Sequence, residues 1–300
     1  MLHEKVSPQT LGFARIAVYG AWFWHVVKDP LDKVTEIPLE YFSPIGVLRL
    51  VPQPAWPLIY TAKSLLVLKL AMLTCLALLV LGVWPFRCIA IFTCILLTFY
   101  QGLIRGFGYI NHGELPILYA AYVLAAFPSA HALSLGRGRV NNAPPILYKA
   151  PMVAAALLLC LTYTFVGARR LVEGGLEIFV NGTIVHMVAL RSFEPGPSGT
   201  GYGHLVLAYP WLALMLQLGF PVVTIFELLS PLCLFYRWFR WAWILAISSF
   251  HVATGLFMQI WFTVNFLLIF VFLTDTDWLF ATWLPQRIKR TARTLLYGGL

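Results

Sequence analysis

Charged side chains are scarce in this chain. They make up 11% of its 300 residues, whereas an ordinary soluble domain carries about 25%. Hydrophobic residues account for 60% of the sequence and aromatic residues for 15%. A water-soluble fold of this size could not cover so much apolar surface, because its exterior needs polar groups that face water. The composition therefore predicts an all-α integral membrane protein, since helices satisfy their own backbone polar groups within lipid.

Cysteine patterns typical of metal or redox sites are also missing. The five cysteines lie within or at the ends of apolar segments, and none belongs to a Cys-x-x-Cys or zinc-type Cys/His pattern. We interpret them as reduced packing residues and expect no metal site. The formal net charge of +9 is spread over short basic clusters between apolar segments. That distribution indicates membrane topology and argues against a nucleic-acid-binding face.

Long apolar segments predict the transmembrane helices, because a bilayer crossing needs about 20 apolar residues. The sequence predicts a bundle of about eight such helices. The predicted spans are Leu11–Val27, Leu58–Trp84, Cys88–Ile104, Leu115–Ala132, Pro151–Ala168, Leu205–Tyr236, Trp241–Phe257 and Trp261–Leu273. The Leu205–Tyr236 segment is too long for one straight span, and Gly219-Phe220-Pro221 and Ser230-Pro231 are predicted kink positions.

Basic residues predict the orientation of these helices. With residues 1–10 in the cytoplasm, the segments on that side carry arginine and lysine with few acidic residues, and residues 274–300 form a basic tail there. The basic residues between the spans on that side are Arg87, Arg137, Arg139, Lys149, Arg237 and Arg240. The opposite loops, near residues 28–57 and 169–204, have mixed charge. By the positive-inside rule, we predict cytoplasmic termini, a transmembrane domain over residues 11–273 and two outer loops.

A few ionisable side chains fall within the predicted spans, where each needs a partner or a function. Arg15 lies near an end of the first span and is expected to extend to the membrane surface. Lys69 lies about 16 Å beyond the start of its span. It is either a snorkelling or salt-bridged side chain, or a desolvated amine that acts as a base. Glu227 must be protonated or paired, with Lys69, Arg170 or His251 as candidate partners.

Polar residues elsewhere have both structural and functional interpretations. His251 lies in an otherwise apolar region and is either a satisfied core histidine or a site residue. Asn265 is predicted to form an interhelical hydrogen bond. Asn111 is predicted to cap the fourth span, which leaves His112 unexplained.

Two adjacent arginines follow the fifth span at its predicted outer end. Arg169 and Arg170 are interpreted as interfacial anchors, with Glu173 at helical spacing from both of them. The alternative is an anion site at the membrane boundary, because guanidinium groups bind carboxylates and other oxyanions well.

Several short motifs follow one another over residues 11–273. They are Leu11-Gly12-Phe13-Ala14-Arg15-Ile16, Asn111-His112-Gly113-Glu114-Leu115, Ala132-Leu133-Ser134-Leu135, Tyr163-Thr164-Phe165-Val166-Gly167-Ala168-Arg169-Arg170-Leu171, Phe179-Val180-Asn181-Gly182, Phe226-Glu227-Leu228-Leu229-Ser230 and Phe250-His251. In order and approximate spacing, they resemble the membrane portion of vitamin K-dependent gamma-carboxylase and the related bacterial HTTM (horizontally transferred transmembrane) proteins.

The resemblance implies chemistry that depends on a quinol such as reduced vitamin K. In that family the quinol is deprotonated, reacts with oxygen and removes a proton from a glutamate side chain, to which carbon dioxide then adds. The candidate catalytic residues are His112 and His251, which the resemblance implies, together with Lys69, which is a substitute base if it faces the same cavity. The implied substrate-binding residues are Asn111, Arg169, Arg170 and Glu227.

The chain departs from the carboxylase at the initiating base. The family has a Gly-x-Lys-Lys-Leu stretch whose second lysine is the base, whereas this chain has Gly167-Ala168-Arg169-Arg170-Leu171. A desolvated amine can lose its proton, but a guanidinium group stays protonated in proteins. After residue 273 we expect only the basic tail and no lumenal domain for a propeptide. Full carboxylation is therefore not expected, and Lys69 is the candidate substitute base.

Three functional hypotheses stay open at this point. The first is a carboxylase-like enzyme or quinol-dependent oxidoreductase that acts on a secreted or membrane protein. The second is a non-catalytic scaffold or maturation factor for such a partner, or a protein that binds a lipid or quinone. The third is a transporter, which is disfavoured because the sequence shows no obvious inverted repeat. All three place the protein in the lipid bilayer.

Overall fold

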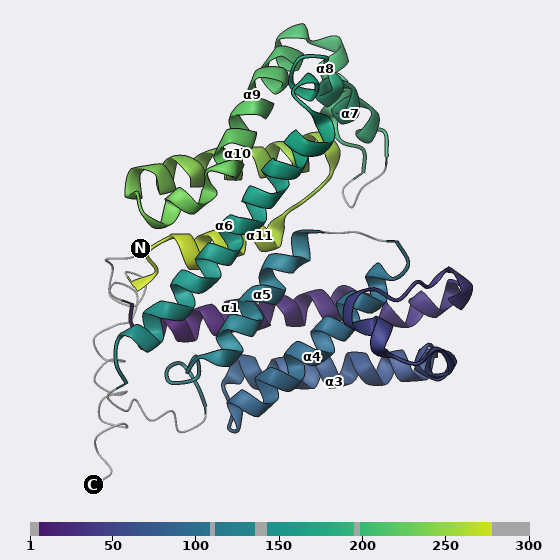
Figure 1. Cartoon of the computed structure of the whole chain (residues 1–300), viewed down its shortest axis with the longest axis vertical. Coiled ribbons are helices and arrows are strands. Elements are labelled where there is room, and N and C mark those ends of the chain that lie inside the picture. The colour runs from purple at the N-terminus through teal and green to yellow at the C-terminus, as the bar shows by residue number, and fades with distance from the viewer. Residues whose placement is uncertain (1–5, 109–111, 136–142, 195–198, 278–300) are drawn as a thin grey trace. The chain divides into compact units, whose positions relative to one another are not determined.

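The computed structural model describes residues 6–108, 112–135, 143–194 and 199–277 (Figure 1). Within these ranges the chain forms α-helices and 3-10 helices and no β-strand, as the predicted all-α fold requires. The chain divides into two compact units. Unit 1 contains His112–Tyr119 and Val153–Ile269, and unit 2 contains Lys5–Asn111, Ala120–Met152 and the residues from Phe270 onward.

Five helices are long and apolar enough to cross a membrane. They are α3 (Ala62–Leu81), α4 (Phe86–Arg105), α6 (Ile146–Gly174), α9 (Pro210–Leu228) and α10 (Arg237–Met258). Two shorter apolar helices are α5 (Leu115–Ala126) and α11 (Thr263–Leu273), and α1 (Pro8–Lys28) has 21 residues. Each of these helices overlaps a predicted span, and the total of about eight spans stays a prediction.

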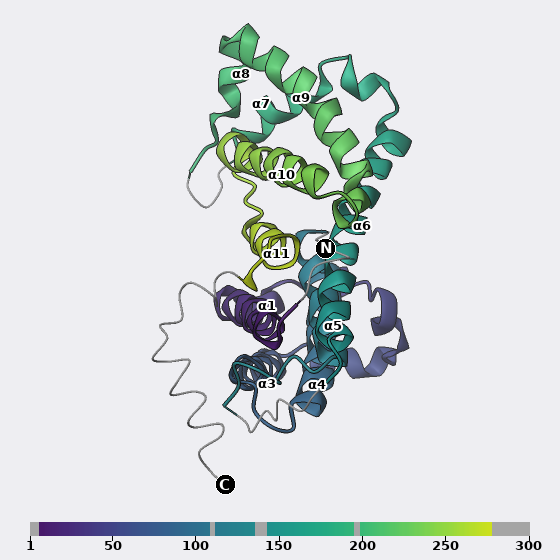
Figure 2. The same ribbon diagram turned by 90° about the vertical axis from the view of Figure 1, so that its left-hand side faces the viewer.

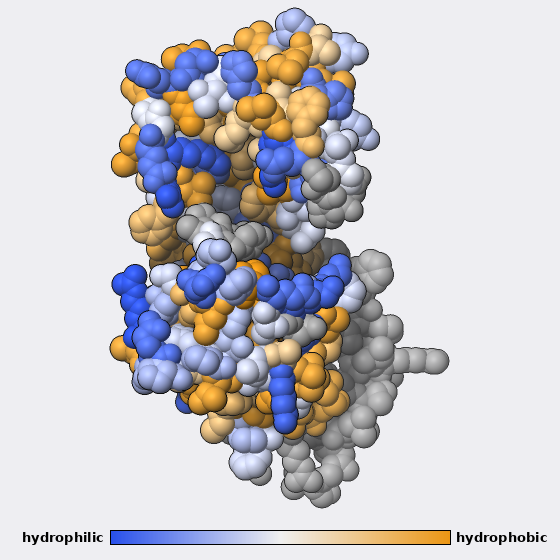
Figure 3. All heavy atoms as spheres, turned by 90° about the vertical axis from the view of Figure 1, so that its right-hand side faces the viewer, coloured by the Kyte–Doolittle hydropathy of each residue, from blue (hydrophilic) through white to orange (hydrophobic). Residues whose placement is uncertain are grey.

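The long helices carry large apolar side chains on their outer surfaces. On α3, Leu66, Val67 and Leu70 are exposed, and on α4 so are Ile91 and Phe92. In Figure 3, hydrophobic residues, coloured orange, lie open on the face that is shown. Such surfaces are expected of helices whose surroundings are lipid tails and not water.

Unit 2 is built around α1, α3 and α4. Helix α1 packs against α3, and α3 packs against α4, as Figures 1 and 2 show. The hydroxyl of Ser7 caps the first turn of α1 by accepting a hydrogen bond from the amide of Thr10 (3.2 Å). Between α1 and α3 lie η1 (Leu31–Glu36), η2 (Leu39–Tyr41), η3 (Gly46–Leu50), η4 (Gln53–Ala55) and α2 (Trp56–Ile59).

Arg15, on α1, is fully buried in unit 2. Its Nη1 atom donates to the carbonyl oxygens of Ser129 (3.1 Å) and Ala132 (3.2 Å). Its Nη2 atom donates to those of Val80 (3.3 Å) and Leu133. The expectation that Arg15 extends to the membrane surface is therefore wrong, because backbone carbonyls from two distant segments accept hydrogen bonds from both of its terminal nitrogens inside the fold.

Arg15 also donates one of the hydrogen bonds that satisfy the carbonyl groups at the C-terminal end of α3. The last four carbonyls of a helix have no partner within the helix. Here the amides of Gly82 and Val83 bond to Leu79 and Leu78 (both 3.1 Å) and that of Leu135 bonds to Leu81 (2.8 Å). Arg15 supplies the donor for the remaining carbonyl, that of Val80.

Unit 1 contains most of α6, followed by α7 (Thr183–Arg191), α8 (Leu205–Ala208), α9 and α10. Helix α10 packs against α9 and α7, and α7 packs against α8 and α9. The short 3-10 helices of unit 1 are η5 (His112–Glu114), η6 (Glu177–Phe179), η7 (Tyr202–His204) and η8 (Ser230–Leu234).

The long apolar segment over residues 205–236 is interrupted, as its length predicts. Helix α9 runs without a break through Pro221, one of the predicted kink positions. The interruptions come instead at Tyr209, between α8 and α9, and at Ser230-Pro231, where η8 begins. The second interruption lies at a predicted position.

Candidate ligand-binding site

The site in unit 1 centres on an ion pair between α6 and α9. The Nη1 atom of Arg170 lies 2.5 Å from Oε2 of Glu227, and the two side chains are 20% and 1% exposed. Gly167, one helical turn before Arg170, makes the close helix packing possible. A Cβ atom at position 167 would lie 3.1 Å from the Cβ atom of Glu227 and 3.2 Å from the backbone nitrogen of Leu228.

The guanidinium group of Arg170 is held by aromatic rings as well as by the carboxylate. Its Cζ atom lies 5.0 Å from the ring centroid of Phe220 and 5.4 Å from that of Phe250, at cation–π distance. Both of its described hydrogen bonds leave from Nη1, to Glu227 and to the hydroxyl of Thr224 (3.5 Å). Within the described residues, Nε and Nη2 therefore remain as donors for another group.

A polar cluster of three residues lies beside this pair, on α6, α10 and α11. The hydroxyl of Tyr163 lies 2.6 Å from Nε2 of His251, and Nδ2 of Asn265 donates to the same hydroxyl (3.1 Å). All three side chains are buried. The predicted interhelical hydrogen bond of Asn265 is thus confirmed. Nδ1 of His251 has no hydrogen-bond partner among the described atoms, and its ring lies 4.5 Å from that of Phe262.

An apolar cavity of about 430 Å³ opens among α6, α7, α9 and α10, all within unit 1. Its walls are mainly aliphatic and aromatic, and Arg170 is the one charged residue among the described lining residues. Side chains that matter for its shape include Ile184, Met215, Phe220, Phe250, Phe257 and Phe262. Such a cavity suits a largely apolar molecule with one polar group that meets Arg170.

The structure brings together some of the predicted site residues. Arg170 is the partner of Glu227 among the three that the sequence allowed, and His251 follows Phe250, whose ring contacts Arg170. Arg169 lies outside this group. It pairs with Glu173 (2.7 Å) on the exposed face of α6, as its anchor interpretation predicts.

The other predicted residues are not part of the described cluster. Lys69 belongs to unit 2, where its Nζ atom donates to the backbone carbonyl of Asp29 (2.6 Å). Asn111 lies outside the described residues. His112 begins η5, and its side chain is likewise outside the described part of the chain.

Sequence reasoning gave no role to Tyr163 or to the aromatic residues around Arg170. Tyr163 occurs in one of the motifs, but nothing in the sequence indicates which residue its hydroxyl contacts. Phe220 precedes a proline and had been assigned to a kink. Its contact with Arg170 depends on helix packing across about 50 residues of sequence.

Comparisons with known proteins add no assignment. No protein-family model matches the chain, and searches of curated proteins and of solved structures find no match either. In the described ranges, no group of three or more His, Cys, Asp or Glu side chains could hold a metal ion.

Proposed function

We propose that this multi-pass membrane protein binds a quinol or a similar amphipathic lipid in the cavity of unit 1. The observation that carries the proposal is an apolar cavity of about 430 Å³ whose wall contains the guanidinium group of Arg170. Hydrocarbon walls favour an isoprenoid or acyl chain. The remaining donors of Arg170 favour a head with oxygen acceptors.

The choice of a quinol rests on the resemblance to the carboxylase and HTTM proteins, which we propose as the lineage of this chain. Two residues from the resembling motifs, Arg170 and Phe250, line the cavity, and a third, Glu227, pairs with Arg170. A head with oxygen acceptors, such as a naphthoquinone, suits this polar end of the cavity.

We propose that the cavity lies on the outer side of the membrane, with both termini in the cytoplasm. The orientation follows from the positive-inside rule. The cavity is lined by Ile178, Ile184, Met187 and Val188, which belong to the predicted outer loop near residues 169–204. A ligand there would be accessible to secreted or membrane partners.

Glutamate carboxylation is not part of the proposal. Arg170 occupies the position of the family's base lysine, and its guanidinium group is paired with Glu227. A protonated guanidinium group binds oxyanions but does not accept a proton. The pair is suited to orienting a ligand head.

The binding proposal is tested by filling the cavity. Gly219 lines it, and a Cβ atom at that position would meet no atom within 4 Å. Gly219→Phe should therefore fold and occupy the ligand's space. We expect it to weaken binding of an isoprenoid naphthoquinone about tenfold or more, which is about 1.4 kcal/mol or more, because the phenyl ring fills space that the ligand needs. Val222→Phe, on the exposed face of the same helix, is the matched control.

Quinone that co-elutes with the detergent-solubilised protein on size-exclusion chromatography is measured by its absorbance. Equal retention by the wild type, Gly219→Phe and Val222→Phe would contradict the proposed cavity. Arg170→Lys retains the charge for Glu227 but removes the planar group. It should weaken quinone retention while leaving retention of a hydrocarbon analogue unchanged.

Whether the protein oxidises a bound quinol is tested separately, by substituting the candidate bases. If the bound quinol is oxidised, Lys69→Ala or His112→Ala should slow oxygen-dependent oxidation of added naphthohydroquinone. Unchanged rates in both variants would exclude these residues from the site. If the wild type binds quinone without oxidising the quinol, the non-catalytic scaffold is the better hypothesis.

A further inference from the structure

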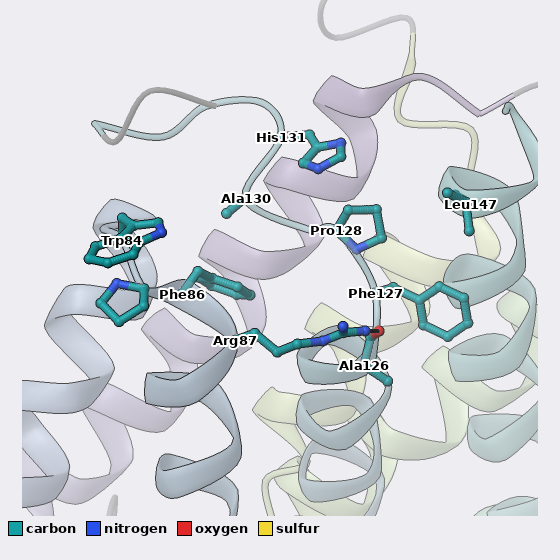
Figure 4. A pocket seen from close by; sticks show the side chains of 10 residues that line it. Trp84, Phe86, Arg87, Ala126, Phe127, Pro128, Ala130, His131 and Leu147 are labelled. Atoms are coloured by element: carbon teal, nitrogen blue, oxygen red, sulfur yellow. Dashed lines mark hydrogen bonds between the residues drawn. The ribbon is translucent and has the colours of Figure 1, made fainter. Parts of the chain in front are cut away.

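A second cavity, of about 550 Å³, lies in unit 2. It is formed where the α3–α4 loop approaches the segment after α5 and the first turn of α6 (Figure 4). The lining residues that matter here are Trp84, Phe86, Arg87, Phe127, His131 and Leu147. It shares no lining residue with the cavity of unit 1.

The position of this cavity, at the ends of two long apolar helices, is the one expected for a site in the headgroup layer of a bilayer. Helix α3 ends at Leu81 and α4 begins at Phe86, and both are long and apolar enough to cross a membrane. The turn between two such helices emerges where hydrocarbon gives way to headgroups. Trp84, in this turn, is 83% exposed, and tryptophan is enriched at that boundary.

Arg87 supplies a fixed positive charge to the cavity. Its Nη2 atom donates to the carbonyl oxygen of Ala126 (2.7 Å), which Figure 4 shows beside the guanidinium group. This bond holds the exposed side chain in place. Among the described residues, Arg87 has no carboxylate partner, and its Nε and Nη1 atoms make no hydrogen bond. A planar guanidinium group with two unused donors matches the oxygens of a phosphate.

The other lining groups limit the charge of the ligand. Nδ1 of His131 lies 3.1 Å from the hydroxyl of Tyr148. Burial lowers the pKa of His131, which favours its neutral ring at pH 7, so Arg87 is the one charged side chain among the described lining residues. No Asp or Glu is found among the described lining residues, so the cavity offers nothing to pair with an ammonium headgroup. Phe86, Phe127 and Leu147 provide apolar walls on either side of Arg87.

We propose that this cavity binds an anionic phospholipid without an amine, such as phosphatidylglycerol, with its phosphodiester against Arg87. The phosphodiester carries one negative charge, which the guanidinium group neutralises. The apolar walls contact the glycerol region and the first part of the acyl chains, since the cavity is too small for a whole lipid. The proposed orientation puts this cavity in the cytoplasmic leaflet, where anionic lipids attract basic residues.

The test is lipid binding by the full chain in detergent, measured by native mass spectrometry. The protein is titrated with phosphatidylglycerol and with phosphatidylcholine of the same acyl chains. We expect the wild type to retain one phosphatidylglycerol in preference to phosphatidylcholine. Arg87→Gln should weaken phosphatidylglycerol retention about fivefold, since one basic residue at a membrane surface contributes about 1 kcal/mol.

Arg237→Gln is the matched control. Arg237 is also an exposed arginine in the first turn of a membrane-crossing helix, α10, but it lines neither cavity. It should leave phosphatidylglycerol retention unchanged. Equal losses in Arg87→Gln and Arg237→Gln, or no loss in Arg87→Gln, would overturn the proposal, because the first indicates a general charge effect and the second excludes Arg87.

Two further arms test the apolar part of the site. Trp84→Ala, at an exposed position that cannot unfold the chain by leaving a core void, should weaken retention of both lipids. Glycerol phosphate, added as a competitor, should displace phosphatidylglycerol poorly because it has no acyl chains. Displacement at concentrations equal to that of the lipid would indicate a free phosphate site and overturn the lipid assignment.

Discussion

Replacing Arg15 by methionine tests how the buried arginine stabilises unit 2. Methionine has a similar length and no charge, so the substitution leaves four backbone carbonyls without the donors that they now have. Hydrogen bonds to a charged group contribute about 1.5–3 kcal/mol each. Four of them sum to roughly 6–12 kcal/mol. Removing a buried charge also relieves a desolvation penalty of several kcal/mol.

The difference between these effects is an expected loss of about 3–5 kcal/mol in unfolding free energy. Arg15→Lys should recover only part of it, because one ammonium group cannot reach carbonyls on two separate segments. Arg49→Met is the control, since Arg49 is exposed and its Nε atom bonds to the carbonyl of Pro44 (3.3 Å) at the surface. Its expected effect lies within about 0.5 kcal/mol.

The assay is thermal and denaturant unfolding of the purified protein in one detergent, with all variants compared under the same conditions. An Arg15→Met variant that unfolds like the wild type would refute the reasoning. So would equal losses for Arg15→Met and Arg49→Met, because burial and the number of carbonyl partners are what distinguish the two arginines.

Three further predictions concern other elements. Glu227→Gln should lower the unfolding free energy by about 3–5 kcal/mol. A second substitution, Arg170→Met, should restore part of that loss. If the losses of the two single variants simply add in the double variant, the ion pair does not stabilise the fold. Gly82→Ala should destabilise by more than about 1 kcal/mol, because φ is 68° there. Gly20→Ala, whose Cβ atom would meet only a Val80 methyl at 4.0 Å, should not destabilise. Because burial lowers the pKa of His131 below 6.5, the unfolded chain binds the proton more readily. The unfolding midpoint should therefore fall as the pH drops below 6.5, and His131→Asn should reduce that fall.

Composition and apolar length were sufficient to predict the helical class and the approximate location of the long apolar helices. These properties are local, since a span is defined by about 20 neighbouring residues. The boundaries were less predictable. Leu115–Ala132 contains a helix that ends at Ala126, because the polar and turn-forming residues that follow bond to one another and to Arg15.

Long-range contacts explain what the sequence could not predict. For Glu227, the sequence allowed three partners, and only packing around Gly167 selects Arg170. Arg15 was interpreted as a surface-reaching residue because its carbonyl partners lie 65 to 118 positions away. Cavities are likewise properties of side chains from several helices, so neither was predictable from a motif.

The pairing of Arg170 with Glu227 also has a consequence for synthesis. The two residues are 57 positions apart, so the ribosome makes α6, α7 and α8 before the carboxylate exists. Until α9 is complete, α6 carries an arginine whose partner Glu227 is still missing, and such a charge is costly in lipid. Stable insertion of α6 is thereby tied to completion of α9. A nascent chain that is truncated before Glu227 would present an uncompensated charge, which distinguishes an unfinished protein from a finished one.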